Sequence, residues 1–118
     1  YEVTHYSQKL GDYRSHLSMK PSEYFARDVA SGASCMPRRE AELRHEIGIE
    51  QIMWGSDYPH PEGTWPVTSN QMVDTFHGLP EDEIGAMLGG NAARFYGFDA
   101  EKLAPLVARI GPEKSRFA

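Results

Sequence analysis

The sequence predicts a helix-rich α/β fold with one or two strands, and two observations support this prediction. Residues 51–54 form the clearest strand, because their apolar side chains do not alternate with polar ones, as is typical of a strand covered on both faces. Several other stretches place apolar residues at helical spacing and carry capping residues at their ends. The strand leads through Gly-Ser into Asp57 and so delivers a carboxylate to its C-terminal end, where parallel α/β folds carry their chemistry.

The first third of the chain gives weaker signals. Residues 1–6 fit a short strand or an irregular end. Residues 20–25 predict the start of a helix, with a proline at an early position and Glu23 as a carboxylate in the first turn. Residues 25–29 continue that helix or form a strand, and the small residues 31–34 are expected to break whichever element it is.

Residues 38–47 predict one amphipathic helix. The sequence RREAELRHEI places Ala41, Leu43 and Ile47 near one face, with charged residues elsewhere. Gly48 follows as the expected C-terminal cap of this helix.

The second half of the chain predicts four helices, at residues 69–76, 80–88, 92–96 and 100–110. Acidic residues open the second of these, as a helix N-terminus favours. We expect residues 89–91 to interrupt the helical run, Gly97 to end the third helix, and Asp99 to cap the fourth, which Pro105 kinks. Residues 111–118 read as a loose tail.

Length and composition restrict the function classes. The chain has 118 residues, enough for one domain, and its net charge is −5 at pH 7. Because no basic stripe is present, we expect no nucleic-acid partner. No apolar run approaches the roughly 20 residues needed to span a bilayer, so a soluble cytoplasmic protein is expected. Cys35 is the only cysteine, which excludes an internal disulfide and a four-cysteine zinc site, and nothing near it predicts a reactive thiol.

Asp57 and the loop that follows it, at residues 58–68, form the candidate site. Asp57 is either an acid at the mouth of the strand or a turn residue that bonds its own backbone. His60 lies three residues further on, where it can lean over the same pocket or pack between two prolines. Tyr58 and Trp65 are candidates for stacking on an aromatic substrate, and packing against the neighbouring prolines is the alternative.

The predicted strand lacks obvious partners. Buried strand N–H and C=O groups must be paired, and only weak candidates exist around Val3 and Val29. Either those segments pair with it, or the strand belongs to a larger sheet whose other members lie outside this chain.

Two sequence blocks resemble the C-terminal end of the amidohydrolase superfamily, in the branch called amidohydrolase family 2. They read IMWGSDYPHPEGTWP and LPEDEIGAMLGGNAARFYG, and the upstream segments MKPSEYF and EIGIEQI fit the same branch. The resemblance implies the C-terminal part of a (β/α)8 TIM-like barrel, incomplete by itself. In that frame residues 49–57 are the last barrel strand, 58–68 the active-site loop and 69–110 the C-terminal helices. Asn91 and Arg94 would then fix the closing helix against the barrel.

The resemblance also implies an activity. Members of this branch hydrolyse or nonoxidatively decarboxylate small, often aromatic, carboxylated substrates with a divalent metal, for which zinc is expected here. Asp57 would contact the metal or its bound water and accept the proton. The chain has no His-x-His, and none of its five histidines, at positions 5, 16, 45, 60 and 77, lies in a context that matches the family's other ligands. His5 and His16 follow no trusted ligand spacing. We therefore expect a C-terminal fragment that lacks most of the metal ligands.

Two other hypotheses remain open at this stage. The first is a mostly helical module without catalysis, which binds a partner, self-associates or pairs with the missing barrel portion; the incomplete sheet motivates it. The second is a nonfunctional remnant that is stable because it buries enough helix surface.

Overall fold

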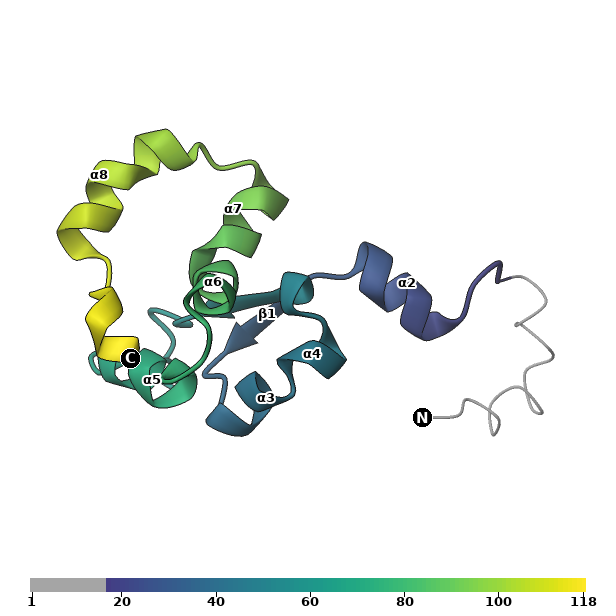
Figure 1. Ribbon diagram of the computed structural model, residues 1–118, viewed down its shortest axis with the longest axis horizontal. Helices are drawn as coiled ribbons and strands as arrows, with labels where there is room; N and C mark the ends of the chain where they lie inside the picture. Colours follow the sequence, from purple (N-terminus) through teal and green to yellow (C-terminus); the bar gives the residue numbers. More distant parts are fainter. Residues whose placement is uncertain (1–16) are drawn as a thin grey trace.

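The computed structural model describes residues 17–118 and shows helices packed against a small parallel sheet (Figure 1). The strand predicted at residues 1–6, which includes Val3 as a candidate to pair with residues 51–54, and the histidines His5 and His16 lie outside the described residues. The elements in chain order are α2 (Pro21–Asp28), β1 (Ser31–Ser34), α3 (Arg38–Glu42), α4 (Arg44–Ile47), the 3-10 turn η2 (Ile49–Gln51), β2 (Ile52–Gly55), α5 (Thr68–Phe76), α6 (Glu81–Gly85), the π-helical turn η3 (Ala86–Gly90), α7 (Asn91–Tyr96), α8 (Ala100–Ile110) and the 3-10 turn η4 (Lys114–Phe117).

Strands β1 and β2 pair in parallel, with Ser31 opposite Ile52 and Ser34 opposite Gly55. The expectation that residues 31–34 only break the chain is wrong. Their sequence, Ser-Gly-Ala-Ser, has no strand propensity, and backbone pairing with β2 makes this segment a strand. Strand β2 is shorter than the predicted segment 49–57. Residues 49–51 of that segment form η2, and residues 56 and 57 follow the strand.

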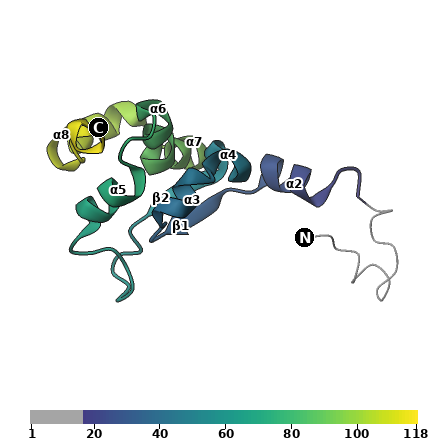
Figure 2. The same cartoon turned by 60° about the horizontal axis from the view of Figure 1, so that its bottom comes forward.

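The core lies on one face of this sheet. Ile52 of β2 is 2% exposed, and Phe76 of α5 and Met87 of η3 are fully buried beside it. Ala33 of β1 packs against the same cluster, whereas its neighbours on the other face, Gly32 and Ser34, are exposed. In Figure 2, α4, α6 and α7 lie above the strands, and α3 overlaps them. Within the described residues, the opposite face of β1 stays open.

The predicted helix 38–47 divides at Leu43 into α3 and α4. Ala41 faces the core as expected, but Leu43 is 40% exposed. Arg44 is buried in its place, and its Nε donates to the Glu83 carboxylate at 2.5 Å. Gly48, with φ 104°, closes α4 through a bond from its N–H to the Arg44 carbonyl, which confirms the predicted cap.

The helical run 81–96 is continuous. We expected residues 89–91 to interrupt it, but Gly90 and Asn91 both have right-handed helical dihedrals, and η3 joins α6 to α7. The two glycines allow a wider π-helical turn here without breaking the helix. Gly97, with φ 67°, ends α7 in the left-handed conformation, as predicted.

The C-terminal residues do not form the expected loose tail. They make the turn η4, and Phe117 is buried in the core cluster. Before it, α8 begins at the predicted cap, where the Asp99 carboxylate accepts the Lys102 N–H at 3.1 Å. Helix α8 contains Pro105 and buries none of its residues.

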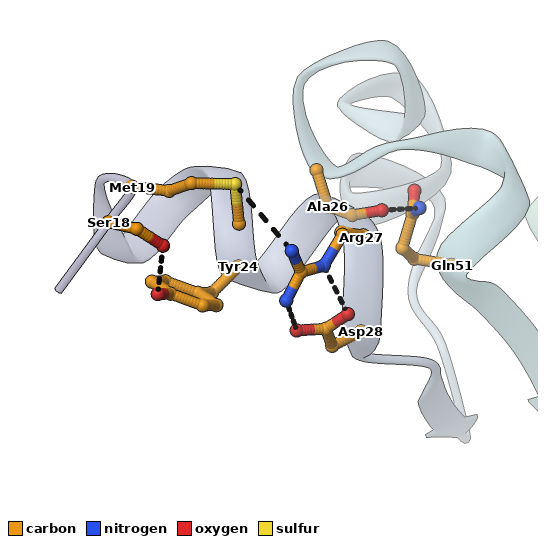
Figure 3. Close-up of polar contacts among 7 residues, drawn as sticks. All are labelled: Ser18, Met19, Tyr24, Ala26, Arg27, Asp28 and Gln51. Carbon is orange, nitrogen blue, oxygen red and sulfur yellow. Dashed lines mark hydrogen bonds and ion pairs between the residues drawn. The ribbon is translucent and has the colours of Figure 1, made fainter.

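Helix α2 leads away from the body of the chain (Figure 1). It extends to Asp28, so the strand alternative for residues 25–29 does not hold, and Glu23 accepts the Lys20 N–H at 2.6 Å as a first-turn carboxylate should. In Figure 3, Gln51 donates to the Ala26 carbonyl at 2.7 Å and connects α2 to η2.

Candidate functional site

Asp57 lies two residues beyond the carboxyl end of β2. Its backbone takes the left-handed conformation, with φ 56°, which aspartate tolerates better than most residues. Its side chain is 46% exposed. The predicted acid therefore lies beyond the carboxyl end of a parallel strand and is open to solvent.

The two ends of the loop that follows Asp57 are joined by hydrogen bonds to one backbone carbonyl. The Ser56 carbonyl accepts both the Thr64 N–H at 2.9 Å and the Thr64 hydroxyl at 3.3 Å. Thr64 is 1% exposed, and its hydroxyl also lies 3.0 Å from that of Thr68, in the first turn of α5. Thr64 thus connects the end of β2 to the start of α5.

Backbone contacts also shape the inner part of the loop. His60 N–H donates to the Asp57 carbonyl at 2.7 Å, and Gly63 N–H donates to the His60 carbonyl at 2.9 Å. A Cβ at Gly63 would lie 2.8–2.9 Å from the carbonyl oxygens of Ser56, Asp57 and His60. Only glycine leaves room for this close approach.

His60 lies beside Asp57. Its Nδ1 is 3.6 Å from Asp57 Oδ2, and the same nitrogen faces the Glu62 N–H at 3.3 Å. When Nδ1 accepts that N–H it carries no proton for Asp57, so the pair becomes an ion pair only when the imidazole is protonated.

Tyr58 and Trp65 lie at the two ends of the loop and meet edge to face. Their ring centroids are 6.2 Å apart with an interplanar angle of 65°. Both rings stay about two-thirds exposed, at 67% and 69%. Large aromatic rings left this open can contact a flat ligand.

Three residues of this region were missed by sequence reasoning. Thr64 and Gly63 act on backbone carbonyls, for which no spacing pattern exists, although a glycine among three prolines was a signal of a tight turn. Cys35, expected to be inert, donates its thiol to the Glu62 carbonyl at 3.2 Å and so connects the end of β1 to the loop.

The described residues do not form a set of metal ligands. Within residues 17–118, no group of three or more His, Cys, Asp or Glu side chains could hold an ion. His45 of α4 lies 3.5 Å from Glu83, and His77, which directly follows α5, has its Nδ1 3.1 Å from the Val73 carbonyl. Asp57 and His60 are therefore at most two of the ligands that a metal needs.

Asn91 and Arg94 hold the helical run against η2 and the first residue of β2, as the resemblance implied. Asn91 Nδ2 donates to the carbonyls of Ile49 at 2.7 Å and Ile52 at 2.8 Å. Arg94 donates to the Glu50 carbonyl at 3.1 Å. These bonds fix the start of the strand that carries Asp57.

A cavity of about 300 Å³ lies between the end of β1 and α5, lined in part by Cys35, Trp54 and Asp74. Asp57 does not line this cavity, and Arg38 on its wall donates to the carbonyls of Thr75 and His77. These bonds give Arg38 a structural role, so the candidate site remains the open end of β2 with its loop.

The comparisons with known proteins identify a family. A family model described as Amidohydrolase matches residues 6–98, which is most of the chain. No curated protein and no solved structure matches it. None of the helices between residues 17 and 118 combines the length and apolar character needed to span a bilayer.

Proposed function

The chain belongs to the amidohydrolase family, and from this premise we propose that it supplies the last strand and the active-site loop of a metal-dependent hydrolase or nonoxidative decarboxylase. One observation carries the proposal: Asp57 follows the carboxyl end of a parallel strand, with its side chain accessible and its backbone fixed by the loop. In barrels, residues at this end of the strands carry catalysis.

In this proposal β1 and β2 are neighbouring strands of a larger (β/α)8 sheet. Within the described residues each has one unpaired edge, because the sheet holds these two strands alone. The open face of Gly32 and Ser34 supports this, since the inner face of a barrel is covered only when its other strands are present. The remaining strands would come from outside residues 17–118.

Asp57 accepts a proton in the proposed reaction. An accessible carboxylate can take the proton from an attacking water or from the substrate, which contributes a rate factor of about 10²–10⁴ in typical enzymes. His60, 3.6 Å away, is placed to contact the same substrate, and its protonated form would pair with the carboxylate.

The proposed divalent metal, with zinc as the expected ion, does not fit the described residues alone. Asp57 would be one ligand, and the others would have to come from outside residues 17–118. We therefore assign no step of the reaction to the metal.

Tyr58 and Trp65 suggest the class of substrate. Their exposed, edge-to-face rings at the two ends of the loop would contact a small aromatic carboxylate from one side. Replacing Trp65 with alanine should then raise KM more for aromatic than for aliphatic carboxylates.

The experiment compares two carboxylate-to-amide changes in the same loop. In the natural polypeptide that contains these residues, Asp57→Asn should lower kcat by about 10²-fold or more against a panel of small carboxylates. Glu62→Gln is the matched control, five residues away, and should leave kcat unchanged. Equal activity of both variants and the unaltered protein would exclude Asp57 from the reaction.

A second candidate function is self-association without catalysis. It is favoured by α8, which is amphipathic and buries none of its residues. Activity that needs both a divalent metal and Asp57 would reject this candidate as the whole function of the chain.

A further inference from the structure

His60 lies in the turn that directly follows Asp57. Its backbone N–H donates to the Asp57 carbonyl at 2.7 Å, and its own carbonyl accepts the Gly63 N–H at 2.9 Å. Its side chain is 56% exposed. The backbone of this residue is therefore held from both sides, whereas its ring is accessible to a ligand.

The two nitrogens of the His60 ring have different surroundings. Nδ1 lies 3.3 Å from the backbone nitrogen of Glu62, and the Glu62 N–H donates to it. A ring nitrogen that accepts an N–H carries no proton of its own. Asp57 Oδ2 lies 3.6 Å from the same nitrogen, which is too far for a hydrogen bond that would hold a proton there. In the neutral imidazole the proton is therefore on Nε2.

The donor that selects this tautomer belongs to the backbone of the loop. The Glu62 carbonyl accepts the Cys35 thiol at 3.2 Å, which connects this part of the loop to the end of β1. Gly63, the next residue, has no room for a side chain between three backbone carbonyl oxygens, so the turn is tight. Because only the backbone of Glu62 takes part, its side chain can be changed without losing this donor.

Nε2 is open to a partner from outside the chain. Among residues 17–118, no oxygen accepts a hydrogen bond from this nitrogen. The two nitrogens of an imidazole ring point in different directions, so Nε2 faces away from the Glu62 N–H. The ring thus offers one N–H donor beside the accessible carboxylate of Asp57.

We propose that His60 orients the substrate: its neutral Nε2–H donates to a carboxylate oxygen of the small aromatic acid while Nδ1 stays on the Glu62 N–H. The inference rests on the proposed function, in which Asp57 accepts a proton, and it assigns the second contact. A neutral donor leaves Asp57 free, because an imidazolium would pair with the carboxylate that has to take the proton. A charged oxygen is the favoured acceptor, since its hydrogen bonds are the stronger ones.

The first test reads the tautomer without any substrate. The natural polypeptide that contains these residues is labelled with ¹⁵N-histidine. Two-bond couplings between ring protons and ring nitrogens then distinguish the tautomers at about pH 8, where imidazoles are ordinarily neutral. His60→Gln removes one set of signals and so assigns it. We expect the Nε2–H form for His60, and an Nδ1–H form would overturn the proposal.

Two substitutions separate the roles of the ring nitrogens. His60→Asn keeps an acceptor near the position of Nδ1 and has no atom at Nε2, whereas His60→Gln places its amide N–H near Nε2. Benzoate is the probe, and its Kd is measured by titration of the backbone amide signals. We expect a Kd about tenfold higher in His60→Asn, and within about threefold of the unaltered protein in His60→Gln.

Benzoate that leaves the His60 ring signals unmoved would overturn the proposal, and so would equal Kd values for the two variants. An unchanged Glu62 amide signal in His60→Asn shows that the turn is kept, so weaker binding is then due to the missing donor. None of these measurements needs turnover. The contact of His60 can therefore fail while Asp57→Asn still lowers kcat, and the role of Asp57 can fail while His60 still binds benzoate.

Discussion

Replacing Asn91 with alanine should destabilise the fold through the start of β2. The Asn91 side chain is 2% exposed, and its two N–H groups donate to the carbonyls of Ile49 and Ile52. Among residues 17–118, no other side chain donates to these two carbonyls. Alanine removes both side-chain donors: the Ile49 carbonyl keeps the bond from the Ile52 N–H, whereas the buried bond to the Ile52 carbonyl is lost.

The magnitude follows from these two bonds. A neutral hydrogen bond contributes about 1 kcal/mol net, and a buried acceptor left unpaired costs about 1–3 kcal/mol. The penalty for the Ile49 carbonyl is smaller, because this oxygen still accepts the Ile52 N–H. We expect Asn91→Ala to lower the free energy of unfolding by about 2–4 kcal/mol, a large share of the roughly 5–15 kcal/mol of a typical domain.

Urea unfolding followed by circular dichroism measures this loss. Arg94→Ala is the matched control, because Arg94 donates to the Glu50 carbonyl from a side chain that is 58% exposed, and should cost less than about 1 kcal/mol. Equal unfolding midpoints for the two variants would refute the role assigned to Asn91. An unchanged m-value would show that compactness is preserved.

Two further predictions concern the loop and α8. Gly63→Ala should lower the free energy of unfolding by about 1–3 kcal/mol, because the added methyl meets three carbonyl oxygens; Gly32→Ala, with nothing within 4 Å, should be far milder, and the opposite order would contradict the loop geometry. The N–H bond from Lys102 lowers the pKa of Asp99 from 3.8, so the carboxylate stabilises α8 above that pH and loses its effect as the pH falls below it. Circular dichroism should show helix lost on acidification, and a profile unchanged in Asp99→Asn would contradict this cap.

The fold was predictable where side chains carry the information. The apolar run of β2, the cap at Asp99 and the left-handed end at Gly97 each have a local cause that the sequence displays. Strand β1 was not predictable in this way. Its residues are small, and only the parallel pairing with β2, across an intervening helical segment, makes them a strand.

The helical run and the tail were misjudged for related reasons. Two glycines lower helix propensity, but burial of Met87 and Asn91 on either side of them holds the run together. Phe117 lies in a short polar stretch without periodicity, and only the tertiary contact with α5 and Gly78 reveals it as a core residue.

The residues of the candidate site also include some that were predictable from the sequence and some that were not. Asp57, Tyr58 and Trp65 were predicted as site residues from their place after a strand and from the family motif. Thr64 and Gly63 shape the loop through backbone carbonyls, which leave no trace in residue spacing. Cys35 reaches the loop from a strand that was itself unforeseen, so its contact with Glu62 could not be anticipated.

The assignment of proton transfer to Asp57 can be checked by chemical rescue. Asp57→Ala, in the natural polypeptide that contains these residues, is assayed with and without added formate, a small carboxylate that can enter the space of the missing side chain. We expect the rate to fall by about 10²-fold or more and to rise again, with saturation, as formate is added. An alanine variant that turns over at the unaltered rate, with formate having no effect, would contradict the role given to this carboxylate.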